Sequence, residues 1–263
     1  MVVSVADADS GTSLELSLDG VLTHASDEAV PESAGADLQF KIYVYGWAPS
    51  VSGDVAVGGR SAPIDASIGS VLSELQGVLS GRFEARSGPW LVFIDAMFSD
   101  LGWEQPLPLG GTLDVDFDQL VVAFGIGHRI GQWPLGDNEN SSVQAEVLGA
   151  LQYTYLKLHI TKTGVLPFER KQSADWVDPV IGGRINLDFS EHWSVVTIGY
   201  IGGFGIGASS QLVWSLHVGL KWSINDWFAL HLGYRILDYD YVRGDFVYDM
   251  RLSGPFMAVS FSF

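Results

Sequence analysis

The segment from residue 211 to residue 224, QLVWSLHVGLKWSI, alternates between large apolar residues and mostly small or polar ones. The apolar row consists of Leu212, Trp214, Leu216, Val218, Leu220, Trp222 and Ile224. A period of two places the two rows on opposite faces of a strand, whereas a helix would scatter both around its circumference. The uncharged stretch from Trp193 to Leu220 is long enough for a transmembrane helix, but its many glycines and β-branched residues favour strands.

The same alternation recurs from Phe40 to the end of the chain. It predicts ten strands, at 40–48, 77–87, 89–100, 111–130, 142–158, 176–189, 193–206, 211–224, 227–240 and 247–263. Helical spacing of apolar residues predicts one short helix near 65–76. The expected fold is all-β, a single closed antiparallel transmembrane β-barrel of about ten strands, with eight and twelve as alternatives.

The connections between these strands also alternate in length. Tight turns are expected at 87–89, 190–192 and 225–227, and longer links at 101–110, 159–175 and 241–246. Outer-membrane barrels have short turns on the periplasmic side and longer loops outside. The connection pattern therefore favours that architecture.

The distribution of charge separates a membrane barrel from a soluble β-sandwich or a lipocalin-like barrel. Apolar residues make up 47% of the chain and charged residues only 17%. The apolar rows are almost free of charge, while the other rows carry Arg, Lys, Asp, Glu and His. An open sheet cannot cross a bilayer, because its unpaired edge groups are costly in hydrocarbon, so the strands are expected to close into a ring.

The first 38 residues differ from the rest. They hold eight acidic residues and no Lys or Arg, which predicts a flexible arm (1–38) before the barrel (39–263). The formal net charge of −17 makes nucleic acid an unsuitable partner. The chain has no Cys, so disulfides and zinc–thiolate sites are excluded.

The last strand ends on alternating apolar residues, Met257, Val259, Phe261 and Phe263. This ending resembles the C-terminal assembly signal of Gram-negative outer-membrane barrels, carried here by Val259, Phe261 and Phe263. Stretches such as GALQYTYLKL and GYRILDYDY are similar to a broad family of proteobacterial-type outer-membrane barrel proteins. The resemblance implies location in the outer membrane, with lipid and the barrel assembly machinery as partners. It supplies no catalytic residues and leaves the oligomeric state open.

The apolar row changes parity inside this last strand. Met250 and Leu252 are the apolar positions before Gly254–Pro255, and Met257 is the first one after it. An extra residue in a strand shifts its faces in this way, so a β-bulge is predicted at Gly254–Pro255.

Two groups of charged residues are candidates for a site in the lumen. The predicted basic wall consists of His217, Lys221, His231, Arg235 and Arg251, and the predicted acidic wall consists of Asp95, Asp114, Asp116, Asp118 and Glu146. A turn centred on Asp226 would place His217 opposite Arg235 and Lys221 opposite His231. The walls either orient small polar solutes in a pore or form an ion-pair network that fills a narrow barrel, since buried charges need partners. The internal network is the favoured interpretation.

The expected function is a structural or surface-interaction role in the outer membrane. A narrow channel for small polar or ionic solutes is the first alternative, because about ten strands leave little open lumen. An outer-membrane hydrolase is the second, but the histidines show no arrangement typical of nucleophilic catalysis. No enzyme activity, cofactor or metal site is predicted.

Overall fold

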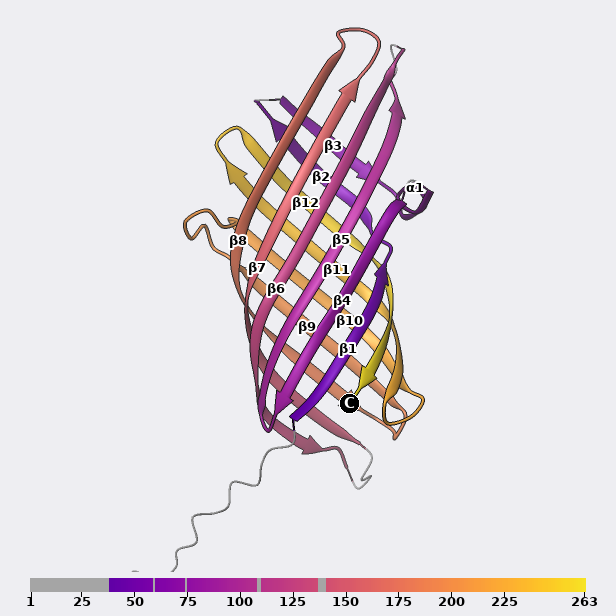
Figure 1. Ribbon diagram of the computed structural model, residues 1–263, viewed down its shortest axis with the longest axis vertical. Coiled ribbons are helices and arrows are strands. Elements are labelled where there is room, and N and C mark those ends of the chain that lie inside the picture. The colour runs from indigo at the N-terminus through magenta and orange to yellow at the C-terminus, as the bar shows by residue number, and fades with distance from the viewer. Residues whose placement is uncertain (1–37, 59, 74, 108–109, 137–140) are drawn as a thin grey trace, which may run out of the picture. The chain divides into compact units, whose positions relative to one another are not determined.

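A ring of ten antiparallel strands forms in the part of the chain that the computed structural model describes, residues 38–58, 60–73, 75–107, 110–136 and 141–263 (Figure 1). The ring comprises β1 (Leu38–Trp47), β4 (Leu75–Ser87), β5 (Trp90–Pro106), β6 (Thr112–Pro134), β7 (Ser142–Lys162), β8 (Phe168–Asp188), β9 (Trp193–Gly203), β10 (Leu212–Ser223), β11 (Phe228–Arg243) and β12 (Phe246–Ser262). The prediction of a closed barrel of about ten strands is confirmed. The predicted acidic arm lies outside the described residues, except for Leu38, which begins β1.

The ring closes where the last strand meets the first. β12 pairs with β1 in antiparallel register, with Val44 opposite Val259. The backbone amide of Phe263 donates to the carbonyl of Phe40 at 2.9 Å. This closure orders the end of the chain and leaves none of the ring's ten strands with a free edge along its full length.

A hairpin extends the wall beyond β1. β2 (Ser50–Val57) continues along β12 in the register of β1, since Trp47 lies opposite Phe256 and Ser50 opposite Ser253. β3 (Arg60–Ala66) then pairs with β2 and, within the described residues, with no other strand. This hairpin was not predicted.

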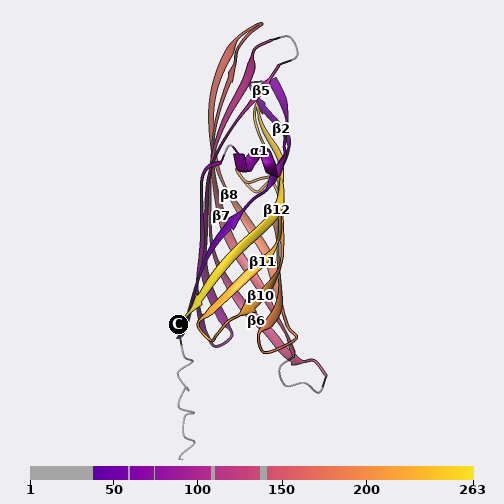
Figure 2. The ribbon, with the colours of Figure 1, turned by 90° about the vertical axis from the view of Figure 1, so that its right-hand side faces the viewer.

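The helix α1 (Ile68–Ser73) confirms the expected helix in a shorter form. It begins after Ser67, whose hydroxyl accepts a hydrogen bond from the amide of Ser70 at 3.2 Å and so caps the helix. Val71 is buried, and Figure 2 shows α1 in the upper part of the barrel, where it contacts β2 and β5. Among the described residues, no helix has the length and apolar character needed to cross a bilayer.

The outward row of β6 changes character along the strand. In its lower half, Phe124 and Ile126 point outward and are 62% and 52% exposed. In its upper half, Asp116 occupies the same outward row. The inward row changes in the opposite sense, from Gly125 below to the buried Phe117 above. Apolar residues therefore face outward in the lower half and inward in the upper half.

The neighbouring strands reverse in the same way. Outward positions change from Leu151 to Lys157 on β7, from Ile181 to Lys171 on β8, and from Leu232 to Asp238 on β11. Hydrocarbon on the outside requires an apolar outer face, whereas water requires an apolar inner one. The reversal therefore marks the boundary between the membrane and the aqueous side.

This boundary overturns the predicted bulge in β12. Met250 and Leu252 point inward and are buried, while Met257 points outward and is 67% exposed. The pairing with β11 continues without a shift along the whole strand. Gly254–Pro255 is therefore no bulge: the strand geometry is constant, and the surroundings of the strand change.

A belt of exposed apolar side chains surrounds the lower half of the barrel. It includes Phe40, Ile42, Val44, Phe83, Val92, Ile94, Phe124, Ile126, Val147, Leu151, Val177, Ile181, Ile201, Leu216, Val218, Leu232 and Met257. Near the short turns, Trp193 stacks on Trp222 with ring centroids 5.6 Å apart. Aromatic rings at the edge of an apolar belt are typical of barrels in the outer membrane. The protein is an integral outer-membrane β-barrel.

One side of the barrel rises well above this belt. β5, β6, β7 and β8 are the longest part of the wall in Figure 1. The links predicted at 101–110, 159–175 and 241–246 are largely strand. Charged residues on the outward row of these extensions hide the apolar alternation that marks the membrane strands.

Candidate functional site

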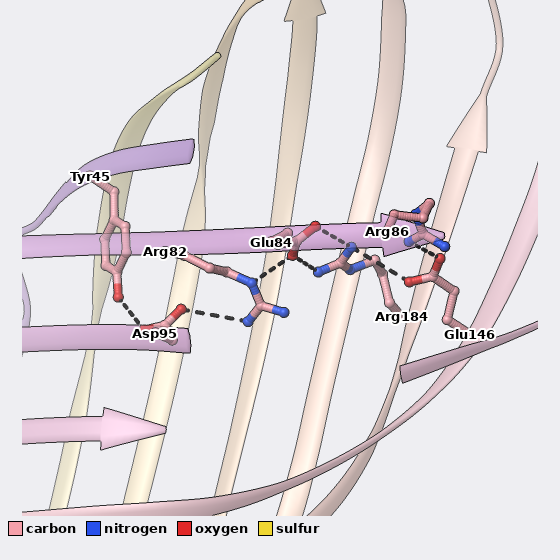
Figure 3. Close-up of polar contacts among 7 residues, drawn as sticks. All are labelled: Tyr45, Arg82, Glu84, Arg86, Asp95, Glu146 and Arg184. Carbon is pink, nitrogen blue, oxygen red and sulfur yellow. Dashed lines mark hydrogen bonds and ion pairs between the residues drawn. The ribbon is translucent and has the colours of Figure 1, made fainter. Parts of the chain in front are cut away.

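The lower lumen holds a chain of alternating carboxylates and guanidiniums. β4 supplies Arg82, Glu84 and Arg86, which share its inward row because side chains alternate along a strand. The nitrogen Nε of Arg82 donates to Oε1 of Glu84 at 2.6 Å, and its Nη1 lies 3.5 Å from Oδ2 of Asp95 on β5. The hydroxyl of Tyr45 donates to Oδ1 of Asp95 at 2.7 Å. Figure 3 shows this row of contacts.

The chain continues across the lumen to the opposite wall. Arg184 on β8 donates two hydrogen bonds to Glu84, of which that from Nη1 to Oε2 measures 3.1 Å. Its Nη1 also lies 3.5 Å from Oε2 of Glu146 on β7. Arg86 donates to the other oxygen of Glu146 at 2.5 Å (Figure 3).

We refer to Arg82, Glu84, Arg86, Asp95, Glu146 and Arg184 as the ion ladder. It contains three acids and three arginines, so its formal charge is balanced. Glu84, Glu146 and Arg184 are each at least 95% buried. Because the ladder runs from β4 to β8, it crosses the lumen at this level.

The upper half of the barrel is filled by aromatic side chains. Trp176 stacks on Tyr241 with ring centroids 4.0 Å apart, and Phe117 stacks on Tyr248 at 6.2 Å. Trp176 also contacts Tyr239 edge to face. We call these five residues the aromatic core. All are at most 3% exposed, so they close the interior above the ladder.

A buried carboxylate fastens a loop beside this core. Asp178 accepts hydrogen bonds from Nε1 of Trp176 at 2.9 Å, from the amide of Ser210 at 2.6 Å and from the hydroxyl of Ser210 at 2.9 Å. Ser210 lies near the end of the connection between β9 and β10 and is fully buried. These bonds satisfy a carboxylate that has no ion pair among the described residues and draw the loop onto the barrel interior.

Most of the predicted basic wall lies in the lumen. His217 is opposite Arg235, and Lys221 is opposite His231, in the predicted register. Arg235 is buried against the ring of Trp47, with its guanidinium carbon 4.6 Å from the ring centroid. The prediction for Arg251 is wrong: its side chain is on the outer face, 58% exposed, and pairs with Asp238 at 2.6 Å.

The predicted acidic wall is divided between the two sides of the barrel. Asp95 and Glu146 lie in the lumen, as predicted. The lumen position predicted for Asp114, Asp116 and Asp118 is wrong, because all three occupy the outward row of β6 above the membrane. Their parity matches that of the lipid-facing row, which the sequence pattern alone does not reveal.

On the outer face these aspartates meet residues of β5 and β7. The carboxylate of Asp118 accepts a hydrogen bond from Lys157 at 3.1 Å, and this bond raises the pKa of Lys157. Asp116 lies 3.4 Å from Nδ1 of His159. Partial desolvation and then the Asp118 carboxylate raise the pKa of Asp100. Further along, hydrogen bonds from Lys171 and His159 lower the pKa of Glu169.

The charges of the lumen therefore do not form two separate walls. Arg82, Glu84 and Arg184 are central to the ladder but were absent from both predicted walls, although the alternation placed them on the polar face. Only the closure of the barrel shows which of these residues meet across the lumen.

Among the described residues, the side chains that face the lumen show no arrangement typical of catalysis or metal binding. Nε2 of His231 lies 2.9 Å from the hydroxyl of Ser260, but within the described segments no carboxylate contacts this histidine. The positive charges of Lys41 and Lys221 act on it instead. Groups of three His, Asp or Glu suited to a metal ion are likewise absent from the described residues.

No family model matches this sequence, and no curated protein matches it significantly. Among solved structures, the outer membrane protease OmpT from Escherichia coli matches with a TM-score of 0.49 and 7% identity, over 87% of this chain and 97% of that chain. The attachment invasion locus protein Ail of Yersinia pestis matches with a TM-score of 0.34 and 13% identity, over 86% and 98%. The toluene transporter TodX of P. putida matches with a TM-score of 0.31 and 10% identity, over 87% and 90%.

Proposed function

We propose that the protein is a closed outer-membrane barrel that does not conduct solutes and acts through the part of its wall above the membrane. The observation that carries this proposal is the double obstruction of the lumen. The ion ladder crosses the lower half, and the aromatic core fills the upper half. A steady pore would require both to move, and each is held by contacts between distant strands.

The wall above the membrane has the features of an interaction surface. The outer faces of β5, β6, β7 and β8 carry closely spaced charges of both signs there, including Asp100, Asp116, Lys157 and Lys171. At the turn between β7 and β8, Leu166 is 79% exposed and has a φ of 56°, a conformation that is uncommon for residues other than glycine. Exposed apolar residues on charged loops suit contact with a partner.

We assign this wall to the outer surface of the cell because the opposite end of the barrel carries the tight turns after β4, β8 and β10. We also propose that Val259, Phe261 and Phe263 serve as the signal for the barrel assembly machinery. Phe263 is 72% exposed at the lipid-facing end of β12, where a recognition strand would be accessible.

Conductance in planar lipid bilayers tests the closed-lumen proposal. The full chain is expected to give no steady openings in potassium chloride. The double variant Glu84→Ala/Arg184→Ala is the matched comparison, and it too should stay closed, because the aromatic core lies above the ladder. Steady openings of the wild-type protein would overturn the proposal and favour the channel alternative.

The narrow channel is the second candidate function. The observation that favours it is an excess of cations among the lumen-facing residues, which would select anions in an open pore. If the channel exists, its conductance should fall when Arg235 is replaced by Met.

A further inference from the structure

The lumen carries more positive than negative charge within the membrane. Seven cationic side chains face inward there, namely Lys41, Arg82, Arg86, Arg129, Arg184, Lys221 and Arg235. Five carboxylates of the described residues also face inward, namely Glu84, Asp95, Glu146, Asp178 and Asp188. The described lumen thus has an excess of two cations, in a chain whose formal net charge is −17.

Most of these charges already have partners. The ion ladder uses three arginines and three carboxylates. The guanidinium of Arg235 lies over Trp47 and contacts the sulfur of Met97. Asp188 accepts hydrogen bonds from the hydroxyls of Ser142 and Ser194. Among the described residues, the ammonium groups of Lys41 and Lys221 have neither a hydrogen bond nor an ion pair, and the same holds for the guanidinium of Arg129 on β6.

These two lysines lie on one arc of the wall, toward the end with the tight turns. Lys221 on β10 is directly opposite His231 on β11. β12 separates β11 from β1, which carries Lys41. Each lysine acts electrostatically on the other and on His231. The carboxylate of Glu84 also acts electrostatically on Lys41, but Arg82 and Arg184 already hold it.

Hydroxyl donors stand beside the lysines. Ser260 on β12 lies 2.9 Å from Nε2 of His231, and Ser262 is the register partner of Lys41. The ring of Tyr43 lies 5.6 Å from that of His231 and covers one side of the cluster. Two ammonium groups, an imidazole and serine hydroxyls supply hydrogen-bond donors from three sides.

We propose that Lys41, Lys221 and His231, with the hydroxyls of Ser260 and Ser262, form a binding site for a phosphate group at the periplasmic end of the lumen. Like charges held close together in a poorly solvated interior repel one another, and a bound anion removes that cost. Phosphate fits better than chloride, because its several oxygens accept hydrogen bonds from separate donors. The site goes beyond the extracellular role proposed above, and only its assignment to the periplasmic end rests on the orientation given there.

The test uses the full chain in detergent micelles and measures binding by isothermal titration calorimetry. The probes are inorganic phosphate, glycerol phosphate as a soluble lipid headgroup, and chloride. Binding of inorganic phosphate but not glycerol phosphate indicates a free ion as the ligand, and binding of both indicates a headgroup or other phosphate ester. Either result supports the site. The absence of binding by both phosphates, or equal binding of chloride, overturns it.

Variants locate the site. Lys41→Met/Lys221→Met is expected to weaken phosphate binding about tenfold or more, because hydrogen bonds to charged groups are lost. Lys157→Met, on the outer face above the membrane, is the matched control and should bind normally. If the double variant does not fold, phosphate-induced shifts of the lysine Nζ resonances in the wild-type protein decide the question. Unchanged affinity in the folded double variant, or unshifted resonances, contradicts the proposal.

Discussion

The guanidinium of Arg184 on β8 crosses the lumen and binds both carboxylate oxygens of Glu84 on β4. The two residues are 100 positions apart in the chain and are both buried. A bidentate pair of this kind fixes both the distance and the orientation of the two walls. The Arg184–Glu84 pair is therefore the central contact of the ion ladder, and removing either side chain should lower the free energy of unfolding.

Replacing Glu84 with Gln should destabilise the barrel by about 3–5 kcal/mol, because Arg82 and Arg184 would remain buried without their shared carboxylate. The measurement is denaturant unfolding in lipid vesicles, followed by tryptophan fluorescence. Glu104→Gln, on the exposed outer row of β5, serves as control and should change little. The double variant Glu84→Leu/Arg184→Met is expected to lose less than Glu84→Gln alone. A decrease in the free energy of unfolding of less than about 1 kcal/mol for Glu84→Gln would show that the ion ladder does not stabilise the barrel.

Replacing Trp176 with Ala should cost about 3–5 kcal/mol through the cavity left in the aromatic core. It should also free the connection between β9 and β10, because Trp176 helps to hold Asp178, which binds Ser210. Limited proteolysis at residues 204–211 measures that release. Trp176→Phe keeps an aromatic ring but loses the hydrogen bond, so it should give a smaller effect. Equal protease resistance in all three proteins would contradict the assigned role.

The neighbouring carboxylates of Asp100 and Asp118 predict that the stability of the folded protein depends on pH through the pKa of Asp100. Because the pKa of Asp100 is raised in the folded state, the folded protein holds this proton more tightly than the unfolded chain. The resulting stabilisation is present at low pH and is lost as the pH rises from the ordinary range of Asp through the raised pKa. Asp118→Asn should lower the pKa of Asp100, as measured by carboxyl NMR titration. Asp65→Asn on β3 is the control, and an unchanged Asp100 pKa in Asp118→Asn would exclude the coupling.

The terminal strand provides a prediction about assembly. Phe261→Ser/Phe263→Ser should reduce several-fold the amount of folded barrel in the outer membrane, because it removes the apolar end of the proposed signal. The folded form is counted by its altered gel mobility without boiling. Leu135→Ser, an exposed apolar residue near the turn after β6, should assemble normally. Normal assembly of the double variant would rule out the signal.

The sequence pattern was sufficient for the membrane strands. Where lipid surrounds the barrel, each strand must show one apolar and one polar row, and the ten predicted segments correspond to the ten strands of the ring. The register of β10 with β11 followed from the tight turn near Asp226, since a short turn leaves little freedom in pairing. His217, Lys221, His231 and Arg235 were therefore placed correctly in the lumen.

The same pattern failed above the membrane for a physical reason. Alternation shows that two rows exist, but the solvent decides which row faces inward. Asp114, Asp116 and Asp118 share the row of Phe124, and Met250 shares the row of Ser260. The predicted bulge and the misplaced aspartates both arose from treating the solvent as uniform along the strand. The ion ladder was missed because its pairs depend on the diameter and closure of the ring.

The membrane boundary is tested most directly by measuring how deep two positions on the outward row of β6 lie in the bilayer. The chain has no native cysteine, so Asp116→Cys and Ile126→Cys can each carry a single spin label in lipid vesicles. At position 126 the label should be accessible to molecular oxygen and shielded from a water-soluble nickel complex, and at position 116 the reverse should hold. Equal accessibility to the nickel complex at both positions would contradict a barrel whose outer face passes from lipid to water along one strand.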